Sequence, residues 1–193
     1  MSRAGMIVLG VVGVLVLLLL MVFGSYISTK NQLVSRDEAV KTAWSDVDTQ
    51  LQRRADLIPN LVETVKGFTK EESGVFANIS AARTGLMNAN SPKEKIAANG
   101  QLDAALAKVL VLTENYPQLR SSEQFMRLQD ELAGTENRIT VSRRRYNDTL
   151  RDYNTYVRQF PNSIWAGMAG FQAKDDQYFK ANEASRTVPG VKF

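Results

Sequence analysis

The chain has 193 residues, 44% of them hydrophobic, with 24 Lys and Arg against 20 Asp and Glu and a net charge of +4. This length suits one domain, and the composition is neither disordered nor of low complexity. Cysteine and histidine are absent from the sequence. Disulfides, thiolate nucleophiles and serine–histidine triads are therefore excluded, and the usual zinc ligands are missing. An active site built from carboxylates alone would still be possible, but the residue types of most active sites are missing. We therefore expect that the protein is not an enzyme and has no catalytic residue, no cofactor and no metal site.

No block of basic residues is interleaved with aromatic residues, and the densest basic run is Arg143–Arg145. Three consecutive helical residues point in three directions, so this run is typical of a solvated face rather than a phosphate clamp. We therefore expect no nucleic-acid partner.

An apolar run without charge, Met6–Phe23, follows a short basic N-terminus at residues 1–5. With Ala4 and Gly5 it reaches about 20 residues, enough to cross a bilayer as a helix. It is longer than the apolar part of a signal peptide, and no A-x-A-like cleavage site follows. The run predicts an uncleaved single-pass anchor, with a cleaved signal peptide as the alternative.

The charges that flank this run bear on its orientation in the membrane. Arg3 precedes the run, whereas Lys30, Arg36 and Lys41 follow it. A short basic start is typical of a signal anchor, which exports the domain behind it, whereas the downstream basic residues favour the cytoplasmic side. We expect the domain behind the run on the exported side of the membrane, with the cytoplasmic side as the alternative.

Helical patterns fill the rest of the chain. Residues 25–31 contain neither proline nor glycine, so the membrane helix can continue into an apolar pattern that runs from Val40 to Leu86. This pattern indicates one helix, or a pair of helices broken near Gly67. A second helix begins at the capping box of Ser91 and Glu94, with Pro92 in the first helical position.

A heptad pattern, typical of a coiled coil, predicts a third long helix from Phe125 to Phe160, which Pro161 ends. A short apolar segment follows at 164–171. Long helices joined by short turns pack antiparallel. The sequence therefore predicts an all-α fold: a transmembrane helix at 6–23, an antiparallel bundle of three long helices plus a short fourth helical segment within 24–172, and a tail at 173–193.

Pro59 lies within apolar spacing that runs unbroken from Leu51 to Val65. It cannot donate to the carbonyl of Ala55 and its ring crowds that turn, so we predict a bent but continuous helix. The freed carbonyl needs a donor from the same helix or a facing one, for which the sequence offers Gln50, Arg54 and Asn60.

Arg54 occupies a core position of the same helix and needs a partner, because an unpaired buried charge is costly. The third helix offers Asp130, Glu131 and Glu136. That helix also carries Asn137 and a Tyr–Asn pair that repeats at heptad spacing, Tyr146–Asn147 and Tyr153–Asn154.

These polar groups have three interpretations. They fix the register of the bundle, as a buried asparagine does in a coiled coil; they form a site for a small ligand or partner; or two carboxylates, such as Asp48 and Asp56, act as an acid/base pair. Nothing beside that pair supplies a nucleophile or a metal set. The structural or interaction candidates are thus Arg54, Asp56, Pro59, Asn60, Glu136, Asn137, Tyr146, Asn147, Tyr153 and Asn154.

Two apolar pieces near the C-terminus add Trp165, Phe171 and Phe193 to the candidates. The first piece has helical spacing, and the second is the tail VPGVKF. We expect surfaces this apolar to be buried against another surface. The bundle itself, the bilayer interface and a neighbouring copy of the protein are the three alternatives.

Four stretches resemble the LemA family: AWSDVDTQLQRRADLIPNLVETVKGF (43–68), YPQLRSSEQFMRLQDELAGTENRI (116–139), RRYNDTLRDYNTYVRQFP (144–161) and the closing PGVKF. The resemblance spans Lys30–Phe193. It implies a membrane-anchored bacterial protein with an antiparallel helical bundle and no established catalytic residue. The family commonly has histidine where this chain has Glu71, so no metal or proton site is implied at that corner.

Taken together, these features predict a structural or scaffolding component of a membrane-associated assembly that acts as a homo-oligomer. The alternative is an adaptor or sensor module that binds another membrane protein, a peptide or a small ligand in a groove of the bundle.

Overall fold

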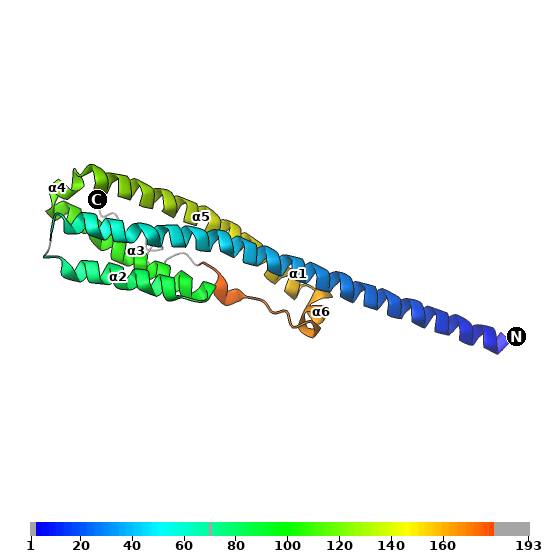
Figure 1. The fold of residues 1–193 in the computed structure, drawn as a ribbon. Coiled ribbons are helices and arrows are strands. Elements are labelled where there is room, and N and C mark those ends of the chain that lie inside the picture. Colours follow the sequence, from blue (N-terminus) through cyan, green and yellow to red (C-terminus); the bar gives the residue numbers. More distant parts are fainter. Residues whose placement is uncertain (1–2, 70, 180–193) are drawn as a thin grey trace, which may run out of the picture. The chain divides into compact units, whose positions relative to one another are not determined.

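The computed structural model describes residues 3–69 and 71–179, and helices make up most of this part of the chain, which contains no strand. The all-α prediction is therefore confirmed. The elements, shown in Figure 1, are α1 (Arg3–Lys66), α2 (Ser73–Asn88), α3 (Pro92–Asn115), α4 (Pro117–Arg120), α5 (Glu123–Arg158), α6 (Asn162–Met168) and the 3-10 helix η1 (Asp175–Gln177).

The chain forms two compact units, which are described separately. Of the described residues, the first unit combines Arg3–Lys41 with Thr149–Lys174, and the second combines those between Thr42 and Asp148 with Asp175–Phe179. The domain boundaries at residues 24 and 172 stay a prediction.

In the first unit, α1 runs without interruption from the apolar segment through residues 25–31, as predicted. The large apolar side chains from Leu9 to Phe23 are exposed, and this end of α1 has no helix beside it (Figure 1). Further along, where α1 runs beside α5, Leu33 and Val40 are buried, as are Leu150 and Val157 of α5.

Two described helices are long and apolar enough to cross a membrane. The most apolar 18-residue stretch of α1 lies near the N-terminus, has a mean hydropathy of 2.5 and contains no buried residue. The most apolar stretch of α3 has a mean hydropathy of only 1.2. Because α3 contributes Leu102, Val109 and Leu112 to the buried core, its apolar character is explained by packing within the second unit.

The end of α5 differs from the prediction. The heptad pattern extends the helix to Phe160 as a core residue, but the helix ends at Arg158 and the Phe160 side chain is 83% exposed. The expected short apolar helix is present as α6.

In the second unit, successive long helices run in opposite directions (Figure 1). The stretch from Val40 to Leu86 is a pair of helices, since α1 ends at Lys66 and α2 begins at Ser73. The capping box is present: Ser91 Oγ accepts from the Glu94 N–H, and the Glu94 carboxylate accepts from the Ser91 N–H, both at 3.3 Å.

Helix α1 continues through Pro59, which confirms the continuous helix. The carbonyl that this proline frees, on buried Ala55, accepts a 2.8 Å hydrogen bond from Arg83 Nε of α2. The proposed donors Gln50, Arg54 and Asn60 were therefore wrong. Arg83 is the only charged residue of α2, and a lone charge on a helix was the signal available in the sequence.

We expect Arg83→Met to lower the free energy of unfolding by about 1–3 kcal/mol, because the carbonyl of Ala55 loses its donor. In a Pro59→Ala background the same substitution costs about 1–2 kcal/mol less, since the new N–H at position 59 can bond that carbonyl. Urea unfolding of the four proteins of this double-mutant cycle measures the coupling. Equal costs of Arg83→Met in both backgrounds would contradict the pairing.

Candidate functional site

A buried arginine joins three helices of the second unit. Arg54 of α1 is only 7% exposed. Its Nη1 lies 2.5 Å from Asp103 Oδ1 of α3 and 2.7 Å from Glu136 Oε2 of α5. The same nitrogen donates to Asn99 Oδ1 at 3.3 Å. The predicted need for a carboxylate partner, and Glu136 as one partner, are confirmed.

Asp103 and Asn99 were missed by the sequence reasoning. Asn99 is buried on α3 and donates through Nδ2 to Asp103 Oδ2 at 3.1 Å, which orients the carboxylate toward Arg54. The spacing of four residues places both side chains on one helix face, and an amide and a carboxylate on the core side of α3 were the available signal. We call these four residues (Arg54, Asn99, Asp103 and Glu136) the arginine cluster.

Chemically, the arginine cluster is suited to holding helices together. Both carboxylates are engaged by the Arg54 guanidinium, and each is about 40% exposed. Glu136 Oε1 also lies 3.9 Å from Arg143 Nη1. Among the described residues, no group of three or more Asp, Glu, His or Cys side chains is arranged to hold a metal ion.

An open groove of about 490 Å³ lies beside the arginine cluster. Its apolar lining comes from α1, α3 and α5, and Leu110 of α3 is 55% exposed there. Its charged lining consists of Arg54 and three carboxylates, Asp103, Asp130 and Glu136. The groove therefore combines apolar walls with an excess of negative charge.

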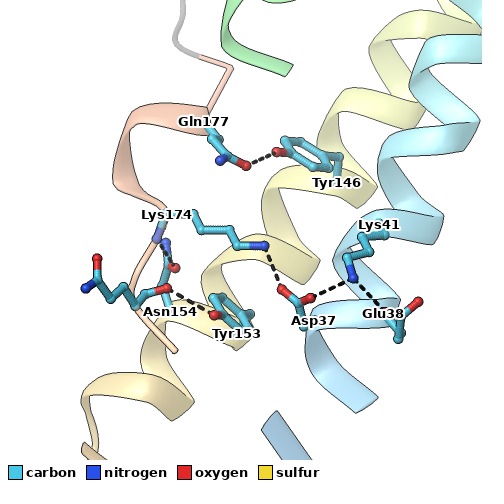
Figure 2. Close-up of polar contacts among 9 residues, drawn as sticks. Asp37, Glu38, Lys41, Tyr146, Tyr153, Asn154, Lys174 and Gln177 are labelled. Atoms are coloured by element: carbon cyan, nitrogen blue, oxygen red, sulfur yellow. Dashed lines mark hydrogen bonds and ion pairs between the residues drawn. The ribbon is translucent and has the colours of Figure 1, made fainter. Parts of the chain in front are cut away.

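The Tyr146–Asn147 pair binds the chain that follows α6. Asn147 Nδ2 donates to the Phe179 carbonyl at 2.9 Å, and the Phe179 N–H donates to Asn147 Oδ1 at 3.1 Å. Tyr146 is buried against the rings of Trp44 and Phe179, at centroid distances of 5.2 and 6.0 Å. Its hydroxyl donates to Gln177 Oε1 at 3.4 Å (Figure 2).

The second pair, Tyr153–Asn154, does the same within the first unit. The Tyr153 hydroxyl donates to the Gln172 carbonyl at 3.0 Å, and the Lys174 N–H donates to Asn154 Oδ1 at 2.8 Å. Lys174 Nζ reaches Asp37 Oδ1 of α1 at 2.6 Å (Figure 2). Each Tyr–Asn pair therefore holds the chain's own backbone after α6, a role that the heptad spacing alone did not indicate.

Three groups at these pairs, Tyr146, Tyr153 and Asp37, have shifted pKa values. Burial raises the pKa of Tyr146 to about 12, with added effects from Asp176 and Tyr178. Burial, followed by the charge of Asp37, also raises the pKa of Tyr153. For Asp37, burial raises the pKa, but the hydrogen bonds and charges of Lys174 and Lys41 outweigh it and bring the pKa below its ordinary value.

Other predicted residues lie outside these contacts. Exposed Asp56 accepts from Gln52 at 3.2 Å, whereas Asp48 pairs with Lys95, so the two aspartates are not brought together as an acid/base pair. Asn60 and Asn137 are exposed. Of the apolar candidates, Trp165 packs against Tyr26, Phe171 is half-buried, and Phe193 lies outside the described residues.

Comparison with known proteins agrees with this architecture. The sequence model of the LemA family matches residues 43–193, and the chain belongs to this family. It is 24% identical over 183 aligned positions to magnetosome protein MamQ 2 of Paramagnetospirillum magneticum, covering 81% of this chain and 66% of that protein. Magnetosome protein MamQ of Magnetospirillum gryphiswaldense is 23% identical with the same coverage.

Protein LemA of Metamycoplasma hominis is 22% identical over 136 positions, which cover 70% of this chain and 62% of that protein. The chain thus spans slightly less than two thirds of the length of the relatives it matches. The chain is thus a helical protein of the LemA family with an exposed N-terminal helical segment that is long and apolar enough to cross a membrane.

Removal of the Arg54 side chain should leave Asp103 without the cation with which it pairs and Glu136 with only Arg143, whose Nη1 lies 3.9 Å away. We expect Arg54→Ala to lower the free energy of unfolding by about 3–5 kcal/mol. Arg53 is the matched control, because it is the exposed neighbour on the same helix, and Arg53→Ala should change stability by less than about 0.5 kcal/mol. Equal effects of the two substitutions in urea unfolding would show that the pairing of Arg54 does not stabilise the fold.

Alkaline pH should weaken the fold through Tyr146. Its pKa is about 12 in the folded chain and about 10 when unfolded, so its contribution is complete below pH 10 and is lost as the pH rises toward 12. The expected loss is about 2–3 kcal/mol. From pH 9 to pH 12, the free energy of unfolding measured with urea should fall less steeply in Tyr146→Phe, which keeps the ring but cannot ionise. Parallel declines in the two proteins would exclude this role of Tyr146.

Proposed function

We propose that this LemA-family protein is a non-catalytic scaffold, held at the membrane by the apolar start of α1, which gathers its own copies into an assembly. Apolar surface that the second unit leaves uncovered carries this proposal. Leu110 and Val111 of α3 are 55% and 59% exposed, and Leu110 borders the groove beside the arginine cluster. Uncovered apolar residues beside a groove are typical of a protein-binding surface.

The use of the polar side chains supports a structural role. The arginine cluster joins α1, α3 and α5, Arg83 joins α2 to α1, and Asn147 holds the chain at Phe179. These groups bind other parts of the same chain. Relatives named as magnetosome proteins also support a part in a larger assembly.

The charge of the groove favours a second candidate function, an adaptor for another protein. Three carboxylates against one arginine, set among leucine side chains, suit a basic amphipathic helix of a partner. An adaptor of this kind would be a monomer when purified alone.

The oligomeric state of the full chain in mild detergent separates the two functions. We expect one uniform homo-oligomer by light scattering, and we expect Leu110→Glu to reduce it to the mass of one 21.5 kDa chain, because a carboxylate cannot enter an apolar contact without cost. Val141→Glu is the control, since Val141 is exposed on α5 and does not line the groove. A monomeric native chain would contradict the scaffold and leave the adaptor.

A further inference from the structure

The first unit carries a second uncovered apolar surface, around α6. Phe160, Ile164 and Met168 are 83%, 51% and 70% exposed. They are spaced four residues apart, which places Ile164 and Met168 on one side of α6 and Phe160 just before it. We call these three residues the α6 face.

Local structure fixes which side of α6 points outward. Buried Ala166 and half-buried Trp165 form its packed side. After the helix, Gly170 adopts a φ of +79°, which allows the Phe171 N–H to bond the Ala166 carbonyl at 2.9 Å and the Gly170 N–H to bond the Gly167 carbonyl at 3.3 Å. This glycine-capped end turns the chain back sharply and holds α6 in place.

The packed side of α6 lies against the part of α1 that follows the apolar run. The Trp165 ring meets the Tyr26 ring edge to face, with a centroid distance of 5.7 Å. Tyr26 comes three residues after Phe23, the last residue of the run, and so lies about 4–5 Å further along the helix axis. With α1 in a bilayer, α6 would therefore sit at the boundary between the hydrocarbon core and the headgroups.

The side chains around α6 suit that boundary. Tyrosine and tryptophan side chains are enriched at that boundary. Trp165 contributes its apolar ring there, since its Nε1 is buried without a hydrogen-bond partner. Lys30 is exposed and follows Tyr26 by four residues, on the same side of α1. Its cation suits the phosphate groups of lipids, while its aliphatic part covers apolar surface.

We propose that the α6 face is a membrane-interface anchor, which inserts Phe160, Ile164 and Met168 into the headgroup region of the bilayer that α1 crosses. The occupant is a lipid surface rather than a second copy, because the contact between Trp165 and Tyr26 places α6 beside the end of the exposed apolar run of α1. This role is independent of self-association. It would give the first unit a second attachment and so fix its height and rotation at the membrane.

The absence of cysteine from the chain allows a direct test with single spin labels. Ile164→Cys, Met168→Cys and Val141→Cys are each labelled in the full-length protein and reconstituted into vesicles of phosphatidylcholine with phosphatidylglycerol. Val141 is the matched control, an equally apolar and 67% exposed residue on α5. The measured quantity is the accessibility of each label to oxygen, which concentrates in lipid, relative to a water-soluble nickel complex.

We expect the oxygen-to-nickel ratio to be several-fold higher at positions 164 and 168 than at 141. A ratio at 164 and 168 equal to that at 141 would show that the α6 face lies in water and would overturn the proposal. Exclusion of both reagents, with spin–spin broadening that disappears when unlabelled protein is added, would show that a second copy covers the face and would also overturn it.

A second measurement, which needs no spin label, shows whether the label itself alters the position of α6. In a Trp44→Phe background, Trp165 is the only tryptophan. Lipids brominated near the headgroup should then quench its fluorescence more strongly than lipids brominated deep in the chains. Equal, weak quenching by both lipids would count against the proposal, with circular dichroism confirming that the variant is folded.

Discussion

The second unit depends on one electrostatic constraint, the burial of the Arg54 guanidinium. A buried cation without a partner is among the costliest features that a fold can contain. Helices α3 and α5 must therefore present Asp103 and Glu136 at the level of Arg54, and a shift of either helix by one turn would break an ion pair. Hydrophobic stripes tolerate such shifts far better, so we infer that the arginine cluster selects one register for the three helices.

The same principle operates wherever the chain would otherwise leave a polar group unpaired. Pro59 frees a carbonyl, and Arg83 of α2 bonds it. The backbone after α6 has no strand partner in the described residues, and asparagine side chains of α5 pair with it instead. These polar side chains thus join one segment of the chain to another. Exposed apolar side chains on α3 and α6 are where we place the interactions of this protein with other molecules.

The parts of the structure that depend on local spacing could be predicted from the sequence. Periodicity gave the helices, the Ser91–Glu94 pattern gave a helix start, and the core position of Arg54 required a carboxylate. The partners across helices could not be assigned in the same way, because they depend on how two helices are docked. Arg83 and Asp103 were missed for that reason, and Phe160 was misplaced because a heptad pattern continues past the point where the helix ends.

The central claim is tested most directly by measuring the register of α1 and α3 in a variant that lacks the charged residues of the arginine cluster. Arg54→Met, Asp103→Leu and Glu136→Met, made together, remove the buried cation and both carboxylates that pair with it. Spin labels on exposed Gln52 of α1 and Gln101 of α3 report the distance between the helices by pulsed electron paramagnetic resonance. We expect one narrow distribution in the native protein and, in the triple variant, a broad distribution with helical content preserved. An unchanged narrow distribution in the triple variant would contradict the claim that the arginine cluster sets the register.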